Sequence, residues 1–150
     1  MGLGHLLFEF SGRINRGKYW LAWLLYAVIY LAFVALGFLT ESTTVQALTA
    51  MIAIVILISS LAAGVKRLHD RNKSGWHIVL FHVAPCVLFF AGMAIASSSA
   101  MVANALGFAA LAIAVWSFVE LGCLRGTIGV NPYGSDPVAP ATIPPIRKPV

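Results

Sequence analysis

The residues that could carry chemistry in this chain are charged and imidazole side chains flanking its apolar segments. They comprise five arginines, one histidine and two carboxylates: Arg13, Arg16, Arg67, His69, Asp70, Arg71, Glu120 and Arg125. Guanidinium groups bind phosphate through paired hydrogen bonds, and a histidine or an aspartate beside them can act as an acid or a base. The set therefore predicts a candidate site for a phosphate or a lipid headgroup, provided that the fold gathers its members into one layer.

A simpler interpretation of the same residues is a membrane anchor. Basic side chains at the ends of transmembrane helices contact anionic lipid headgroups, and carboxylates such as Asp70 and Glu120 neutralise neighbouring cations. We favour the anchor, because the usual placement of positive charge in membrane proteins already accounts for most of the pattern.

Glu120 is the single acidic residue inside an apolar segment. A lone carboxylate at that depth is unfavourable, so a cationic partner is expected, and Arg67 and Arg125 are the candidates. Glu120 should then face the interior of the helix bundle. A clamp between helices is favoured over a proton or cation site, because Glu120 lies near the end of its segment rather than at mid-membrane.

A second constellation lies in the third apolar segment, where His82, Cys86 and Met93 fall on one helical face. Imidazole, thiolate and thioether groups are ligands for soft metals and haem. Three residues on one helix do not define a site, so we interpret them as packing residues and predict no bound metal and no cofactor. Pro85 removes a helical hydrogen bond and predicts a kink in this segment.

The elements that position these residues are apolar segments long enough to cross a membrane. Of 150 residues, 60% are hydrophobic and 10% are charged, whereas an average soluble domain has about 25% charged residues. Four apolar runs cover residues 20–39, 45–64, 77–96 and 102–122. Each is close to the ~20 residues that span the hydrocarbon core of a bilayer. The sequence predicts an all-α membrane protein, a bundle of four transmembrane helices within residues 1–126.

The positions of lysine and arginine predict how these helices are oriented. All ten of these residues lie before the first run, between the second and third, or after the fourth. The connections 40–44 and 97–101 contain none of them. Because cytoplasmic loops carry the excess of positive charge, both termini are predicted to be cytoplasmic. The basic charge therefore points to anionic lipid headgroups as partners, and not to nucleic acid.

The two ends of the chain differ from the segments between them. Residues 1–19 carry leucines and phenylalanines followed by a basic cluster, which predicts a short interfacial segment. Residues 127–150 are rich in proline and glycine without an apolar period, which predicts an extended or disordered cytoplasmic tail. Small residues at helical spacing, such as Ser59 and Ala63, allow close packing within one bundle or between copies. A homo-oligomer and a larger membrane complex both stay open.

Three motifs occur in order along the chain. Residues 10–20 read FSGRINRGKYW, residues 66–76 read KRLHDRNKSGW, and residues 126–137 read GTIGVNPYGSDP. With these motifs the chain resembles the domain of unknown function 805 family of small bacterial inner-membrane proteins, from about Phe10 to Pro137. The resemblance implies four helices in a bacterial inner membrane, and it brings no established activity and no catalytic residues. Lys66 stands where we expect a second arginine, so the charge is kept but the planar fork is lost.

The function that these observations favour is a non-enzymatic accessory, scaffold or regulatory subunit that acts through its basic cytoplasmic face. One alternative is a small oligomeric transporter or channel, although the mid-membrane region lacks the paired charges that mark ion pathways. Another is a binder or enzyme of phospholipid headgroups that uses the loop 67–76. No nucleophile elbow, zinc motif or paired acidic cluster occurs, so no catalytic residue is assigned.

Overall fold

The computed structural model describes residues 3–139, which form two long helical hairpins and one short helix. The helical elements are α1 (Leu3–Phe8), α2 (Arg16–Thr40), α3 (Thr43–Asp70), η1 (Val79–Val83), α4 (Ala84–Ile95), α5 (Ala100–Ser117) and η2 (Phe118–Cys123). Both η elements are π-helical turns, and they continue directly into α4 and out of α5. Within the described residues the only bridge between extended segments joins Asn131 to Gly134.

The four predicted apolar runs coincide with these helices, so the all-helical prediction is confirmed. The stretches Arg16–Thr40, Thr43–Asp70 and Ala100–Cys123 are long and apolar enough to cross a membrane. The remaining apolar helix, Val79–Ile95, is shorter. Helix α3, which corresponds to the second apolar run, continues beyond the predicted end at residue 64 and reaches Asp70. This extension carries the middle motif on the last turns of α3.

Local chemistry explains where the helices begin and turn. The side chains of Asn15, Ser42 and Ser99 each accept a hydrogen bond from a backbone N–H in the first turn of α2, α3 and α5. Such N-caps satisfy donors that have no partner inside the helix. Glu41 closes the first hairpin in the left-handed region at φ 48°. The π-turn η1 precedes Pro85, where the missing N–H would otherwise leave a gap in the α-helical ladder.

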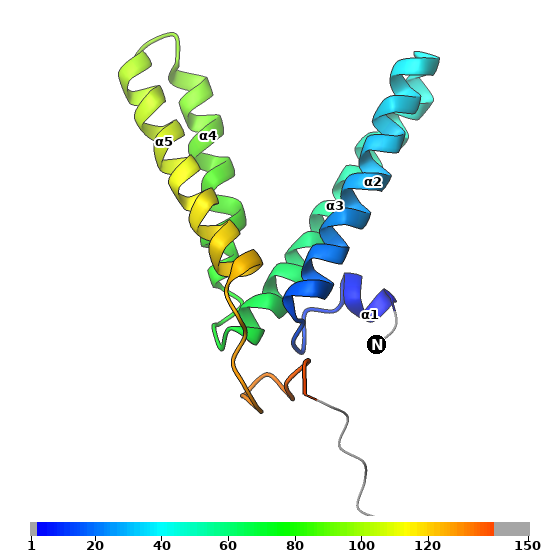
Figure 1. Ribbon diagram of the computed structural model, residues 1–150. Coiled ribbons are helices and arrows are strands. Elements are labelled where there is room, and N and C mark those ends of the chain that lie inside the picture. Colours follow the sequence, from blue (N-terminus) through cyan, green and yellow to red (C-terminus); the bar gives the residue numbers. More distant parts are fainter. Residues whose placement is uncertain (1–2, 140–150) are drawn as a thin grey trace, which may run out of the picture.

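The two hairpins do not close into the predicted four-helix bundle. They meet at one end and diverge away from it, so that α2 and α3 form one arm of a V and α4 and α5 form the other (Figure 1). In lipid, acyl chains cover apolar helix surface as well as other helices do, so nothing forces the arms together. Contact between the arms therefore depends on specific packing at the shared end.

We call that shared end the junction and define it as residues 10–20, 59–78 and 118–138. The buried apolar cluster lies there and includes Ile14, Tyr19, Leu68 and Leu121. A run from Ala62 to Leu68 on α3 is continuously buried. The arms approach closely at Gly122, where an added Cβ would lie 2.6 Å from Cζ2 of Trp20. Glycine is required at that contact because any side chain would displace the indole.

Candidate functional site

Asp70 lies at the centre of the junction, at the end of α3. Its Oδ1 accepts hydrogen bonds from Arg13 Nε at 3.2 Å and from Arg13 Nη2 at 3.0 Å. Its Oδ2 accepts a hydrogen bond from Nη1 of Arg67, one turn earlier on the same helix. Arg13 is 5% exposed and Arg67 is fully buried. The three side chains form a buried arginine–aspartate–arginine triad in which one carboxylate neutralises part of two positive charges.

Arg13 also holds the segment that follows the last helix. Its Nη1 donates to the carbonyls of Gly129 at 2.7 Å and Gly134 at 3.1 Å, and its Nη2 donates to that of Thr127. The planar guanidinium thus reaches a carboxylate on one side and a turn of backbone on the other. Arg13 thereby links the first motif to both of the others.

The C-terminal end of η2 is capped by side chains from the other arm. The last carbonyls of a helix have no partner within it, and basic side chains are favourable there because that end carries partial negative charge. Here five consecutive carbonyls are satisfied in this way. Arg67 donates to the carbonyls of Leu121 and Leu124. Trp20 donates to that of Gly122, and Arg16 to that of Cys123. Arg71 donates to the carbonyl of Arg125.

The segment after η2 is fastened to the end of α3. The backbone N–H and the hydroxyl of Thr127 donate to the carbonyl of Asp70 at 2.8 and 3.0 Å. The amide of Asn131 donates to the carbonyl of His69 at 2.9 Å. The ring of Tyr133 stacks on His69 with centroids 4.0 Å apart. The part of the expected tail within residues 127–139 therefore follows an ordered path, and residues 140–150 lie outside the described part of the chain.

No residue with a side chain can replace Gly126 without displacing its neighbours. An added Cβ there would lie 2.0 Å from Oδ2 of Asp70, well inside the contact distance of real atoms. The glycine of the third motif therefore allows the backbone to pass directly against the carboxylate of the triad.

Glu120 is buried, with 5% of its surface exposed, and it faces the junction where the sequence predicted the interior of a closed bundle. The predicted partners are wrong, because Glu120 binds neither Arg67 nor Arg125. Its Oε1 accepts from Arg71 Nε at 3.1 Å and from Lys73 Nζ at 2.9 Å. The reason is the extension of α3: Arg67 is still helical and points at Asp70, and the turn after α3 carries Arg71 and Lys73 to η2.

Lys66 is a buried charged residue whose bonding partner was not predicted from the sequence. Its Nζ donates to the carbonyl of Leu6 at 2.6 Å, and Ser59 donates to the carbonyl of Leu7 at 2.7 Å. Both bonds cap the end of α1 from the side of α3. A single carbonyl is a point acceptor, so an ammonium group serves there without the planar fork of an arginine. The small residue at position 59 gave the only sequence signal for this contact.

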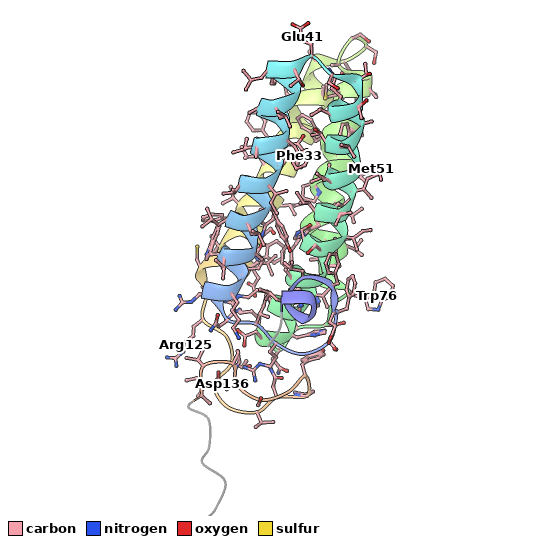
Figure 2. All side chains as sticks on the ribbon, turned by 90° about the vertical axis from the view of Figure 1, so that its right-hand side faces the viewer. Phe33, Glu41, Met51, Trp76, Arg125 and Asp136 are labelled. Carbon is pink, nitrogen blue, oxygen red and sulfur yellow. The ribbon has the colours of Figure 1, made fainter. Side chains whose placement is uncertain are left out.

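A polar cavity of about 200 Å³ opens at the junction. Asn15, Arg16, Arg125 and Asp136 are among the residues that line it, with Arg67 and Asp70 also at its wall. Backbone N–H groups of Val138 and Gly129 hold the pKa of Asp136 below its usual value, so this carboxylate is ionised at neutral pH. Arg125 and Asp136 lie at the same end of the molecule, opposite Glu41 (Figure 2).

An apolar groove of about 370 Å³ lies in the angle of the V. Its walls come from both arms: Tyr19, Trp20, Trp23, Phe81, His82, Pro85, Cys86, Ala114, Ser117 and Phe118. His82 and Cys86 thus share this groove, whereas Met93 lines a separate groove between α4 and α5. The three residues are not brought together. Among residues 3–139 no group of three or more histidine, cysteine, aspartate or glutamate side chains is placed to hold a metal ion.

All eight candidates from the sequence meet at the junction, but they differ in burial and in bonding and fall into three sets. Arg13, Arg67 and Asp70 are buried and bonded within the chain, so they do not form a lipid-facing surface. His69, Arg71 and Glu120 also bind neighbouring elements. Arg16 and Arg125 remain exposed beside the polar cavity.

Comparison with known proteins places this architecture in a family. A family model described as "Protein of unknown function (DUF805)" matches residues 7–135. The chain is 33% identical over 142 residues to "Uncharacterized protein YiiR" of Escherichia coli (strain K12), covering 91% of this chain and 90% of that protein. It is 27% identical over 128 residues to "Inner membrane protein YhaI" of the same strain, covering 85% of each chain. No solved structure matches.

The matched region contains the first two motifs, residues 126–135 of the third, and every helix from α2 onward. Together with the apolar helices, the inner-membrane relative indicates a bacterial inner-membrane protein. The structure shows the role of the three motifs, since each of them supplies residues to the hydrogen bonds and ion pairs that join the arms at the junction. The chain belongs to the DUF805 family of proteins of unknown function.

Proposed function

We propose that the protein is a non-enzymatic scaffold or accessory subunit, in which the junction holds two hairpins at a fixed divergence for another component of the membrane. The observation that carries this proposal is how the charged side chains of the three motifs are used. Those of Arg13, Arg67 and Asp70 bond to one another and to backbone carbonyls. A transport pathway or a catalytic centre would present such groups to a substrate or to water.

The proposed topology has four membrane crossings, with the junction and both termini in the cytoplasm. The three basic segments meet at the junction, and the turns at the far ends of the two hairpins carry no lysine or arginine. This distribution supports a cytoplasmic junction by the positive-inside rule. The helix Val79–Ile95 is shorter than the others, and local thinning or interfacial residues accommodate such a mismatch.

Cysteine labelling tests the topology. In a chain with Cys86 and Cys123 replaced by serine, Ser74→Cys reports on the junction side and Ser98→Cys on the far side; both serines are exposed. A membrane-impermeant maleimide should label Ser98→Cys in intact cells and label Ser74→Cys only after the membrane is opened. Labelling of Ser74→Cys from the periplasm would overturn the topology.

Photocrosslinking in cells tests the scaffold function. Tyr30 lies on the same face of α2 as the groove residue Trp23, two turns further along the helix. Phe90 lies on the same face of α4 as the groove residue Cys86, one turn further along. Val28 lies on the opposite face of α2 and is the matched control, since both Tyr30 and Val28 are exposed. A photoreactive residue at Tyr30 or Phe90 should crosslink to one defined protein in stoichiometric yield, and one at Val28 should not.

The junction variant Asp70→Asn should abolish this crosslink while the chain stays in the membrane, and Glu41→Gln should leave the crosslink intact. Equal crosslinking from all three positions would contradict a partner held between the arms. Solute or ion flux by the purified protein in liposomes, dependent on Glu120, would replace the scaffold with a transporter.

A further inference from the structure

We propose that the junction binds one anionic phospholipid, with its phosphate between Arg16 and Arg125 and one acyl chain in the apolar groove at the angle of the V. This site does not depend on the scaffold function, because it is formed by one chain alone. It differs from the headgroup site predicted for loop 67–76, because the free donors come from Arg16 and Arg125 outside that loop, while Arg67 and Asp70 in the wall are bonded to each other.

The polar half of the site has an excess of positive charge. Arg16, Arg67 and Arg125 line the cavity together with the carboxylates of Asp70 and Asp136. Asp70 is shared by Arg13 and Arg67, so it does not offset the charge of the other two arginines. Asp136 offsets only one of them. A cavity of about 200 Å³ with this balance favours a phosphate over a metal cation.

Arg16 keeps most of its hydrogen-bonding capacity. Its Nη1 donates to the carbonyl of Cys123 at 2.7 Å, and a guanidinium has five N–H donors. This bond fixes the direction of the side chain, and the exposed guanidinium retains donors for a phosphate oxygen. The guanidinium of Arg125 is also exposed at the same cavity.

The apolar half begins one helical turn from Arg16. Trp20 follows Arg16 by four residues on the same face of α2, and its Nε1 donates to the carbonyl of Gly122, next to the carbonyl that Arg16 binds. Trp20 and Phe118 pack edge to face with centroids 5.5 Å apart and form the start of the groove. A volume of about 370 Å³ is within the range of small-molecule pockets.

The combination of the two halves selects the occupant. A free phosphate would use the cavity and leave the groove unfilled, and an apolar helix would fill the groove and leave the excess positive charge of the cavity without an anion. A phospholipid satisfies both with one molecule. Trp20 and Trp23 are partly exposed at the first turns of α2, the depth at which tryptophan marks the boundary between headgroups and acyl chains.

Native mass spectrometry of the detergent-solubilised protein, titrated with dioleoyl phosphatidylglycerol, tests the proposal. One lipid should bind per chain, and dioleoyl phosphatidylcholine with the same acyl chains should bind more weakly. Because a basic residue near a headgroup contributes about 1 kcal/mol, Arg16→Gln and Arg125→Gln should each weaken binding about fivefold. The double variant should weaken it about 25-fold.

Matched variants separate this site from general charge attraction. Lys18→Gln removes the same charge from the first turn of α2 but on the opposite side of the helix, and it should change the affinity little. Ala114→Phe fills the groove and should reduce binding without a change in charge. Asp136→Asn removes the opposing carboxylate and should tighten binding, a gain that misfolding would not produce.

Three outcomes would overturn the site. Phosphatidylcholine could bind as tightly as phosphatidylglycerol, Lys18→Gln could weaken binding as much as Arg16→Gln, or inorganic phosphate at equal concentration could displace the lipid completely. The last result would show that the cavity binds the anion alone and that the groove has no part in it.

Discussion

The junction and the far ends of the two hairpins are built in opposite ways. At the junction, residues from all three motifs cross between the arms, and buried charges are paired with carboxylates or carbonyls. At the far ends, each hairpin closes on itself through local caps such as those of Ser42 and Ser99. Glu41, at the far end of the first hairpin, is exposed and lies opposite Arg125 and Asp136 (Figure 2).

The difference between the junction and the far ends shows that this chain concentrates its few charged residues where the two hairpins are joined. In lipid there is little hydrophobic drive to bring apolar helices together, so the angle between two hairpins must be set by polar bonds and close packing. The chain places both at one end. The junction should therefore control the stability of the whole fold, and changes at the far ends should stay local.

The largest expected effect comes from Asp70→Ala. The change leaves Arg13 and Arg67 buried without a carboxylate, and breaking such a buried group of charges costs about 3–5 kcal/mol. The midpoint of thermal unfolding in detergent should fall sharply. Glu41→Ala, which removes an exposed carboxylate from the far end, should change the stability by at most about 0.5 kcal/mol. Equal effects of the two changes would refute the division between the two ends.

A steric change at Gly126 should be the next largest. In Gly126→Ala the new Cβ would meet both oxygens of Asp70, at 2.0 and 2.7 Å, while two arginines hold that carboxylate in place. Forcing an extra carbon into such a packed site costs about 1–3 kcal/mol. Gly107→Ala on α5 is the control, because nothing beyond the neighbouring backbone of its own helix lies within 4 Å of the added Cβ. In a helix that change should be neutral or stabilising.

Glu120→Gln should have a smaller effect than Asp70→Ala. The partners Arg71 and Lys73 keep 24% and 33% of their side chains exposed, so water partly compensates them when the carboxylate is lost. We expect a cost of about 1–2 kcal/mol in detergent unfolding. The double variant Glu120→Gln, Arg71→Gln should cost less than the sum of the single changes. Strict additivity would show that this ion pair does not join α3 to η2.

Much of the fold could be predicted from the sequence, because it depends on local patterns. Apolar runs of span length and cap residues such as Ser42 and Ser99 act within a few residues of the chain. The gathering of the charged residues at one end follows from four helices that alternate in direction, with every lysine and arginine outside the two far turns. The V shape could not be predicted in this way, since lipid and protein cover an apolar face equally well.

The pairing within the site was less predictable for a geometric reason. The end of α3 decides which basic residue meets Glu120, and hydropathy placed that end near residue 64, whereas the helix reaches Asp70. An error of more than one turn exchanged Arg67 for Arg71 and Lys73 as the partners. The capping of the η2 carbonyls was invisible to residue patterns, because main-chain acceptors have the same chemistry at every position.

The smallest expected effect is at the far end, and it tests whether the two regions are independent. Ser42 caps α3 by accepting from the N–H of Val45 at 3.4 Å. Ser42→Ala should cost about 0.5–1 kcal/mol, because an N-cap satisfies one donor of the first turn. Hydrogen exchange should quicken at the first amides of α3 and stay unchanged at the amide of Thr127, which donates to the main-chain carbonyl of Asp70. Asp70→Ala keeps that carbonyl but breaks the triad through which Arg13 holds the segment after η2. The amide of Thr127 should therefore exchange faster in Asp70→Ala, while the first amides of α3 stay protected as before. If Ser42→Ala also quickened exchange at Thr127, the arms would transmit strain along their length, and the junction would not be a separate unit of stability.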